Sequence, residues 1–334
     1  MPVLDTLGRP LTDLRISVTD RCNFRCTYCM PKGVFGKDFK FLPAAALLTF
    51  EEIERLARIF VAHGVEKIRL TGGEPLLRRG LEQLIARLAA IEGLNDLTLT
   101  TNGSLLEKQA RPLRDAGLKR ITVSLDSLDD AIFRAMNDVD FPVSRVLDGI
   151  DAASAAGFDR IKINCVVKRG VNEASVVDLA RRFRATGHII RFIEYMDVGS
   201  TNGWRLDDVV PADEILAMLD AEFGVEPIAA INQSDVARRY RFKHGGEFGI
   251  IASVTQPFCR DCSRARLSSE GLLYTCLFAT VGHDLRAPLR TGKSDTEISS
   301  LLRGIWHVRA DRYSELRTAD TVNLPKVEMS HIGG

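Results

Sequence analysis

Long hydrophobic runs are absent from this chain of 334 residues. No stretch approaches the roughly 20 apolar residues that a membrane-spanning helix needs, so we do not expect this chain to span a membrane. The first residues, MPVLDTLGRPLTDLRISV, show neither the pattern of a secretory signal nor that of a transit peptide. An excess of one charge is also missing, because 45 Lys and Arg residues balance 44 Asp and Glu residues. This balance argues against a protein that coats nucleic acid.

Cysteine is scarce, and its placement is more informative than its number. There are seven, and an odd count fits a disulfide-stapled scaffold poorly. Six of them form two groups of three near opposite ends of the chain, with Cys165 alone between the groups. Such groups indicate ligand sets for metals in a reducing compartment, so we expect a cytoplasmic protein.

The composition is otherwise globular, with 45% hydrophobic and 27% charged residues, and at roughly 150 residues per domain the length suggests two domains. Strand and helix patterns alternate through the first two thirds of the chain. Expected strands cover residues 13–19, 66–72, 96–102, 119–126, 160–167 and 188–196, and expected helices cover 50–64, 81–93, 104–117, 143–157 and 172–187. Such alternation predicts parallel βαβ units with right-handed crossovers. Six units are fewer than the eight of a closed barrel, so we expect an α/β fold, an incomplete (βα)6 TIM-like barrel.

Alternation along these strands separates a polar face from an apolar one. The polar face carries Arg15, Ser17, Thr19, Arg69, Thr71, Thr98, Thr100, Asn102, Thr122, Ser124, Asp126, Lys162, Asn164, Glu194 and Met196. Ile193, Tyr195 and Cys165 fall on the apolar face, and we interpret Cys165 as a core residue. The polar face predicts a ligand cavity, because each unpaired buried polar group costs on the order of 1–3 kcal/mol. A doubly wound sheet with some buried Thr and Ser is the alternative.

From about residue 225 the pattern changes. The segments ARRYRFKHGGEFGIIASVT and RARLSSEGLLYTCLF predict antiparallel hairpins with turns at GG and EG, and a short helix is expected near 295–307. We therefore divide the chain into a partial barrel, residues 1–224, and a C-terminal region, residues 225–334, that covers the open side of the barrel.

The spacing Cys22-x3-Cys26-x2-Cys29 directly follows the first expected strand. Three thiolates on one short loop suit three irons of a [4Fe–4S] cluster and leave the fourth iron open, whereas zinc sites close at four ligands. With Tyr28 before the last Cys, this motif resembles the radical S-adenosylmethionine (SAM) superfamily. The sequence Thr71-Gly72-Gly73-Glu74-Pro75 is similar to that superfamily's GGE motif. The resemblance implies that Tyr28, Gly73, Ser124 and Met196 bind SAM.

A second set of three thiols, Cys259-x2-Cys262-x13-Cys276, also lacks a clear fourth ligand. Taken alone it favours zinc, with His283 completing the site, but beside the first motif it favours a second cluster with an open iron. Arg264 and Arg266 follow at once, and in an extended strand both guanidinium groups face one side, where they suit a phosphate or carboxylate.

These features together resemble the GTP 3′,8-cyclase (molybdenum cofactor biosynthesis protein A) family. The matching stretches are 14–31, 41–53, 68–78, 100–103, 124–129, 161–172, 191–199, 258–278 and the terminal Gly333-Gly334. The resemblance implies two [4Fe–4S] clusters, on Cys22, Cys26 and Cys29 and on Cys259, Cys262 and Cys276. It implies that SAM is cleaved to methionine and a 5′-deoxyadenosyl radical, which takes hydrogen from C3′ of GTP so that C3′ joins C8. The product is (8S)-3′,8-cyclo-7,8-dihydroguanosine 5′-triphosphate, in the first step of molybdenum cofactor biosynthesis.

The expected GTP-binding residues are Arg15, Arg69, Thr100, Lys162, Arg264 and Arg266, and the resemblance gives Arg264, Arg266, Gly333 and Gly334 catalytic roles. It also implies an unidentified electron donor and a downstream cyclic pyranopterin monophosphate synthase. We expect no nucleic-acid or membrane partner, and the sequence leaves the oligomeric state, a homodimer included, open. The alternatives are a peptide-modifying radical SAM enzyme with auxiliary clusters, an iron–sulfur electron carrier, and a zinc-stabilised binding module.

Overall fold

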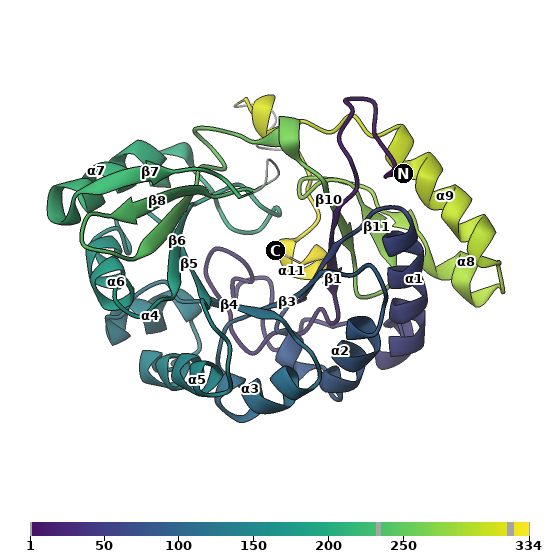
Figure 1. Cartoon of the computed structure of the whole chain (residues 1–334), viewed down its shortest axis with the longest axis horizontal. Helices are drawn as coiled ribbons and strands as arrows, with labels where there is room; N and C mark the ends of the chain where they lie inside the picture. The colour runs from purple at the N-terminus through teal and green to yellow at the C-terminus, as the bar shows by residue number, and fades with distance from the viewer. Residues whose placement is uncertain (1, 232–234, 319–323, 334) are drawn as a thin grey trace.

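The computed structural model describes residues 2–231, 235–318 and 324–333. Its strands form one sheet of 12 members in the order β12-β11-β10-β1-β2-β3-β4-β5-β6-β9-β8-β7, which curves into an open barrel with helices around its outside (Figure 1). The strands are β1 (Asp13–Ser17), β2 (Lys67–Thr71), β3 (Asp96–Thr101), β4 (Arg120–Ser124), β5 (Lys162–Val167), β6 (Ile189–Glu194), β7 (Val225–Ile228), β8 (Arg238–Phe242), β9 (Glu247–Ile251), β10 (Arg264–Leu267), β11 (Leu272–Tyr274) and β12 (His283–Asp284).

The helices are α1 (Phe50–Ala62), α2 (Leu81–Ala89), α3 (Leu106–Asp115), α4 (Asp130–Asn137), α5 (Val143–Ala155), α6 (Ser175–Phe183), α7 (Ala212–Phe223), α8 (Arg286–Arg290), α9 (Asp295–His307) and α11 (Met329–Ile332). Short 3-10 turns lie at Ala44–Ala46, Pro75–Leu77, Leu206–Asp208, Cys259–Asp261 and Tyr313–Glu315. Among the described residues, no helix has the length and apolar character needed to cross a bilayer.

Helix α1 shows how the sequence builds this outer layer. The Thr49 hydroxyl accepts a hydrogen bond from the Glu52 backbone N–H, and the Glu52 carboxylate accepts one from the Thr49 N–H, so a capping box starts the helix. The apolar stripe of Ile53, Leu56 and Phe60 is buried in the core against the sheet. The polar face of β1 to β6 is thereby left to point inward, which positions the site.

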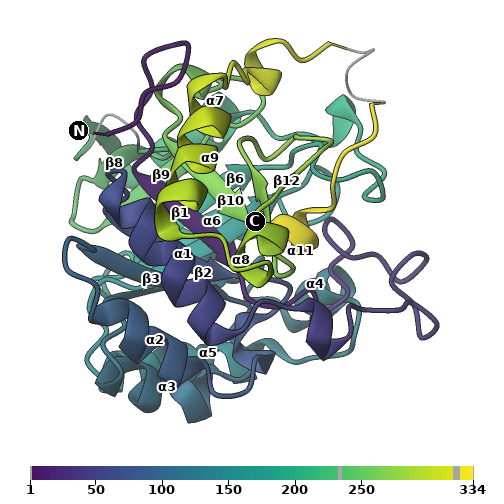
Figure 2. The ribbon, with the colours of Figure 1, turned by 90° about the vertical axis from the view of Figure 1, so that its right-hand side faces the viewer.

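The C-terminal strands extend the barrel at both edges. β10 pairs parallel with β1, and β9 pairs parallel with β6. The two predicted hairpins are confirmed as β8–β9 and β10–β11, with turns at Gly245-Gly246 and Glu270-Gly271. Helices α8 and α9 lie beside α1 (Figure 2), where Arg55 of α1 pairs with Asp295 of α9 at 2.7 Å. The predicted partial barrel with an antiparallel C-terminal region over its open side is confirmed.

All six predicted barrel strands and the five predicted helices are present, each shorter than its predicted range, and α9 matches 295–307. The sequence pattern missed the helices α4, α7, α8 and α11 and the strands β7 and β12. Cys165 is fully buried in the core, as predicted.

The predicted faces of the sixth strand are wrong by one residue. Asn164 of β5 lies opposite Arg191 of β6, so Arg191 and Ile193 share its inward face. Glu194 points outward instead and accepts hydrogen bonds from the N–H groups of Ala212 and Val254. The prediction took a polar residue to face the cavity, but this carboxylate is satisfied by backbone donors in the outer layer.

Candidate active site

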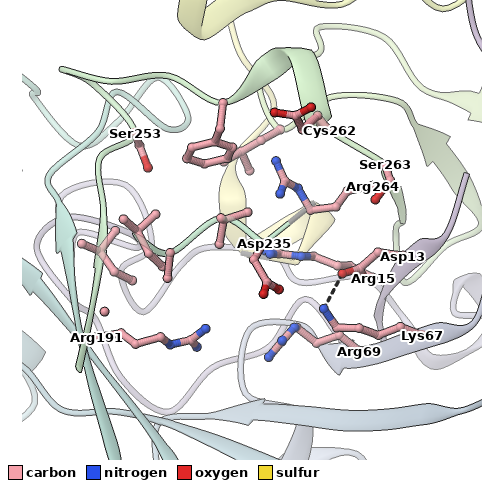
Figure 3. A pocket seen from close by; sticks show the side chains of 18 of the residues that line it. Asp13, Arg15, Lys67, Arg69, Arg191, Asp235, Ser253, Cys262, Ser263 and Arg264 are labelled. Carbon is pink, nitrogen blue, oxygen red and sulfur yellow. Dashed lines mark hydrogen bonds and ion pairs between the residues drawn. The ribbon is translucent and has the colours of Figure 1, made fainter. Parts of the chain in front are cut away.

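A cavity of about 1280 Å³ occupies the interior of the barrel. All six residues predicted to bind the nucleotide line it: Arg15, Arg69, Thr100, Lys162, Arg264 and Arg266. Figure 3 shows Arg191 reaching into this space from one side while Arg15, Lys67, Arg69 and Arg264 enter from the other. The alternation of the strands therefore located the cavity correctly.

The cationic side chains in the cavity are crowded. Burial, together with the charges of Arg266 and Arg69, holds the pKa of Arg15 well below its usual range. Burial and the nearby charge of Arg264 lower the pKa of Arg266 to about 10. The Nε atoms of Arg15 and Arg69 are buried without a hydrogen-bond partner among the described residues. Buried donors of this kind are costly unless a ligand satisfies them, so the arrangement suits a polyanion.

The sequence analysis missed further cations that line the cavity, Arg191 and Lys67 among them. Arg191 donates to the Asn164 side chain at 2.9 Å, and burial followed by repulsion from Arg69 lowers its pKa to about 9. It was missed because the sixth strand was assigned the wrong inward face. Lys67 pairs with Asp13 at 2.6 Å, and the alternation that placed Arg69 inward would also have placed Lys67 there.

Lys162 has an unusual environment for a lysine. Burial, followed by repulsion from Arg191 and Arg120, lowers its pKa to about 7. The ion pairs in the described part of the chain do not include it, although Asp235 also enters this space (Figure 3). A buried ammonium of this kind gains its charge fully only when an anion arrives.

The first cysteine set lies on a tight loop after β1. The N–H groups of Cys29 and Met30 both donate to the Cys26 carbonyl at 2.9 Å, which folds the loop back on itself. Burial raises the pKa of the Cys22 thiol to about 11, and burial followed by the charge of Cys22 raises the pKa values of Cys26 and Cys29. The three sulfurs thus lie close enough to oppose one another's ionisation. Bound iron would remove that opposition by holding the thiolates.

The thiols of each set need not converge on one point to hold a cluster. Throughout the described ranges, no three His, Cys, Asp or Glu side chains converge on a point where they could hold a single metal ion. In a [4Fe–4S] cluster each thiolate binds a different iron, so the sulfurs need not converge. His283 is exposed on β12, and among the described residues no group of three or more possible metal ligands joins it to the second cysteine set.

The GGE segment supports the first cysteine loop. A Cβ at Gly73 would lie 2.3 Å from the Arg21 carbonyl oxygen, so only glycine permits the two loops to meet. Glu74 is buried and accepts hydrogen bonds from the Thr101 hydroxyl and the Asn102 N–H, both at 2.7 Å. Burial raises its pKa to about 7. The close approach that requires Gly73 is therefore to this chain's own backbone, and Gly73 is not among the cavity-lining residues.

The other residues predicted to bind SAM lie on the cavity side of this loop. Tyr28, Ser124 and Met196 all line the cavity. The Tyr28 hydroxyl donates to the Asp126 carboxylate at 2.7 Å, which fixes the ring beside Cys29. Ser124 is the last residue of β4, and Met196 lies two residues beyond the end of β6.

All three members of the second cysteine set, Cys259, Cys262 and Cys276, line the cavity directly. Arg309 donates to the Cys262 sulfur at 3.3 Å and to its carbonyl at 2.8 Å. Although burial opposes ionisation, the charges of Arg264 and Arg309 lower the pKa of Cys262 to about 7. Burial raises the pKa of Cys276 to about 12. Arg309 carries no motif and follows α9 in an irregular segment, so the sequence offered no signal for it.

The C-terminal segment enters the barrel, and its end lies in the middle of the view in Figure 1. The Gly333 carbonyl accepts a hydrogen bond from Arg266. A Cβ at Gly333 would lie 2.4 Å from the Thr71 side chain, and its φ of +74° is left-handed, so glycine is required there. The structure therefore brings Gly333 to the predicted cavity residues, whereas Gly334 lies outside the described residues.

Asp197, directly after Met196, anchors this tail. It accepts hydrogen bonds from the Tyr313 hydroxyl at 2.6 Å and the Arg317 Nε at 3.0 Å, and the Lys326 ammonium lies 3.2 Å from it. Asp197 and the side chains of Arg317 and Lys326 are buried. One carboxylate thus ties three tail positions to the end of β6.

Glu328 makes a second anchor. Its carboxylate accepts hydrogen bonds from the Ser200 N–H at 2.9 Å and the Thr201 hydroxyl at 3.0 Å. Its charge adds to the raised pKa of Cys29, after burial and Cys22. The tail therefore passes the first cysteine set on its way to Arg266.

Two family models match the chain: the radical SAM superfamily over residues 16–183 and Molybdenum Cofactor Synthesis C over residues 188–315. A GTP 3′,8-cyclase of Acidothermus cellulolyticus is 54% identical over 100% of this chain and 99% of its own length. The GTP 3′,8-cyclase of Xanthomonas campestris is 53% identical over 100% of this chain and 98% of its own length. The GTP 3′,8-cyclase of Staphylococcus saprophyticus is 50% identical over 99% of each chain.

Solved structures share the fold at low identity. Streptococcus suis SuiB bound to S-adenosylmethionine superposes with a TM-score of 0.61 at 15% identity, over 95% of this chain and 72% of its own. Methylornithine synthase superposes with a TM-score of 0.50 at 17% identity, over 64% of this chain and 62% of its own.

Proposed function

The chain belongs to the radical SAM superfamily and, within it, to the GTP 3′,8-cyclase family, and on that premise we propose how its residues perform the family's reaction. It is an enzyme that converts GTP into (8S)-3′,8-cyclo-7,8-dihydroguanosine 5′-triphosphate and cleaves SAM, in the first step of molybdenum cofactor biosynthesis. Two [4Fe–4S] clusters and SAM as cosubstrate follow from the family.

The assignment of the substrate site rests on one observation. The cavity contains more cationic side chains than carboxylates, and the second cysteine set lines the same cavity. Arg15, Arg69, Lys162, Arg264 and Arg266 take part in none of the ion pairs of the described residues, and two orphaned Nε donors point into the same region. A triphosphate supplies several negative charges and many acceptor oxygens, which would satisfy these donors. Arg191 and Lys67 join the predicted set, and Thr100 offers a hydroxyl.

We assign the first cluster to Cys22, Cys26 and Cys29 and the second to Cys259, Cys262 and Cys276. A cluster held by Cys22, Cys26 and Cys29 would supply the electron for reductive cleavage of SAM, which provides the 5′-deoxyadenosyl radical for hydrogen abstraction at C3′ of GTP. Tyr28, Gly73, Ser124 and Met196 belong to the SAM site: three of them line the cavity beside the first loop, and Gly73 keeps the loop in place.

The tail closes the proposed nucleotide site. Gly333 holds Arg266 through its carbonyl, so Arg266 is fixed in orientation before the substrate binds. We propose that Arg264, Arg266, Gly333 and Gly334 act together on the bound GTP, and that the packed tail excludes water from the radical.

Residues 1–224 would then supply the SAM site and residues 225–334 the second cluster, the two arginines and the tail. Further parts of the proposal are a separate electron donor, a downstream cyclic pyranopterin monophosphate synthase, and a cytoplasmic location, which suits seven unpaired cysteines.

Anaerobic reconstitution tests the proposal. Two four-iron clusters predict about eight irons per chain. With SAM, dithionite and GTP the protein should form 5′-deoxyadenosine and the cyclised triphosphate in equal amounts, and ATP, CTP or UTP should give no cyclised product. One or two zinc ions per chain would instead favour a zinc-stabilised binding module. Clusters without SAM cleavage would favour an electron carrier.

A further inference from the structure

The segment that follows the first cysteine loop has no role in the site described above. Residues 31–42, PKGVFGKDFKFL, form a loop that projects from the body of the molecule beside α4 (Figure 2). We call it the basic aromatic loop. Val34 is 46% exposed and Phe39 is 37% exposed, and Lys37 and Lys40 on either side of Phe39 in the sequence are exposed as well. Exposed apolar and cationic side chains in one loop mark a surface for a partner.

The basic aromatic loop is packed internally and is tied to the cysteine loop. Its aromatic rings follow one another, with centroids 4.6 Å apart for Phe35 and Phe39 and 4.9 Å apart for Phe39 and Phe41. Arg25 lies between Cys22 and Cys26 and donates to the Phe35 carbonyl at 2.7 Å. It also donates to the Cys22 carbonyl at 2.8 Å. One guanidinium thus joins the exposed loop to the backbone of a cluster ligand.

The charge of this surface is one-sided. The guanidinium groups of Arg21 and Arg25 lie 5.5 and 5.6 Å from the centre of the Phe41 ring. Asp38 is the one acidic residue in the loop sequence. Lys32 pairs with Asp138 at 2.8 Å, but the ion pairs of the described residues include neither Lys37 nor Lys40. A local cationic patch on a chain of net charge +1 favours an acidic partner over a polyanion that wraps the surface.

We propose that the basic aromatic loop is the docking site of an acidic one-electron carrier protein that reduces the first cluster. The proposal rests on the proposed function, in which each SAM cleavage consumes one electron. The carrier is oxidised by one electron, and that electron ends on SAM, whose C5′–S bond breaks to give methionine and the 5′-deoxyadenosyl radical. The interior side of the cysteine loop belongs to SAM and the tail, which leaves the Arg25 side for electron entry.

The size of the surface suits a brief encounter. Electron-transfer complexes bury less than about 1,200 Å² and form quickly through complementary charges around an apolar centre. Phe39 and Val34 supply exposed apolar groups, and Lys37, Lys40 and Arg21 supply exposed positive charges in and beside the same loop. Electron transfer needs only proximity, so a tight complex is not required.

The test compares the reconstituted holoenzyme with a Lys37→Glu/Lys40→Glu variant. Lys108→Glu/Lys243→Glu makes the same charge change at exposed sites on α3 and at the β8–β9 turn. Oxidised flavodoxin, an acidic flavoprotein, is the binding probe, and Kd is measured by titration at low and high salt. We expect Kd to rise about tenfold in the loop variant at low salt, to stay unchanged in the control, and to converge with the wild type at high salt.

Activity with two reductants separates this proposal from the function on which it rests. With photoreduced flavodoxin the loop variant should form 5′-deoxyadenosine about tenfold more slowly than the control, and with dithionite all three proteins should match. Equal flavodoxin binding and equal flavodoxin-driven rates in both variants would overturn the docking site. So would anionic vesicles or RNA that bind the wild type tightly and lose binding in the loop variant. Failure of the wild type with dithionite would instead overturn the proposed function.

Discussion

Lys162 makes the cation-lined cavity testable by pH. Its pKa of about 7 in the unliganded protein results first from burial and then from repulsion by Arg191 and other cavity cations. A bound triphosphate would favour the charged ammonium and return the pKa toward the ordinary lysine value of about 10.4. GTP binding above pH 7 therefore requires uptake of a proton by Lys162. Affinity is fully present below pH 7 and declines as the pH rises through that value.

The size of the decline follows from these two pKa values. If only the protonated form of Lys162 binds the triphosphate, the apparent Kd for GTP rises about 50-fold between pH 7 and pH 9. That factor corresponds to about 2.3 kcal/mol of binding free energy. The Lys162→Arg variant should keep its charge to higher pH than the wild type, because even in this cavity the guanidinium of Arg191 has a pKa of about 9, above the value of about 7 for Lys162.

The assay is anaerobic titration calorimetry with GTP at pH 7, 8 and 9. At pH 8 two buffers of different ionisation enthalpy report proton uptake directly. The ionisation of GTP itself affects the wild type and Lys162→Arg equally, so the difference between their slopes isolates Lys162. We expect a steep slope and nearly one proton taken up in the wild type, and neither in the variant beyond the nucleotide's own contribution. Equal slopes and equal proton uptake would refute the role given to Lys162.

Three further predictions concern the clusters, the arginines and the tail. Cys22→Ser should abolish SAM cleavage, measured as 5′-deoxyadenosine. Cys276→Ser should retain part of the SAM cleavage and lose formation of the cyclised product. Equal loss of both activities in the two variants would contradict the separate roles proposed for the two clusters. Arg264→Ala and Arg266→Ala should each weaken GTP binding by at least about tenfold and leave SAM binding within about twofold, because the loss of a charge-assisted hydrogen bond costs about 1.5–3 kcal/mol. An unchanged Kd for GTP in either variant would contradict the assignment of that arginine to the GTP site. Asp197→Asn weakens both buried ion pairs of the tail, and the loss of one partner of such a pair costs about 3–5 kcal/mol. Trypsin should therefore cut the tail of this variant faster, and the variant should form more 5′-deoxyadenosine than cyclised product. Glu297→Gln, at the exposed start of α9, is the control, and an intact tail with equal amounts of the two products in Asp197→Asn would exclude the anchor.

The sequence was most informative where the signal is local. The alternation of β1 to β5 gave the inward faces of Arg15, Arg69 and Lys162, because a period of two is fixed by the backbone of a strand. The spacing of each cysteine set lies within one loop or hairpin, so its members had to be neighbours. The parts of the fold that follow from pattern were therefore predicted together with the cavity.

What the sequence could not supply depends on contacts between distant segments. The inward face of β6 is set by its pairing with β5, and the run from Ile189 to Glu194 has no clear alternation of its own, so Arg191 was missed. Arg309 reaches Cys262 across 47 positions of sequence. Asp197 gains its partners only because the tail folds back over the end of β6. None of these contacts has a spacing that a single sequence displays.

The tail anchor and the cation cluster address one physical difficulty. Buried guanidinium groups repel one another and lose hydration, so bringing them together in one cavity lowers the stability of the fold. The Gly333 carbonyl offsets part of that cost for Arg266, and it supplies no negative charge that a triphosphate would have to displace. A carboxylate in its place would neutralise the site and compete with the substrate. The carboxylates that hold the tail bind other groups: Glu328 of the tail accepts from backbone and hydroxyl donors, and Asp197 beyond the end of β6 binds Arg317 and Lys326 of the tail. The tail can therefore be fixed firmly while the cavity keeps its positive charge for the nucleotide.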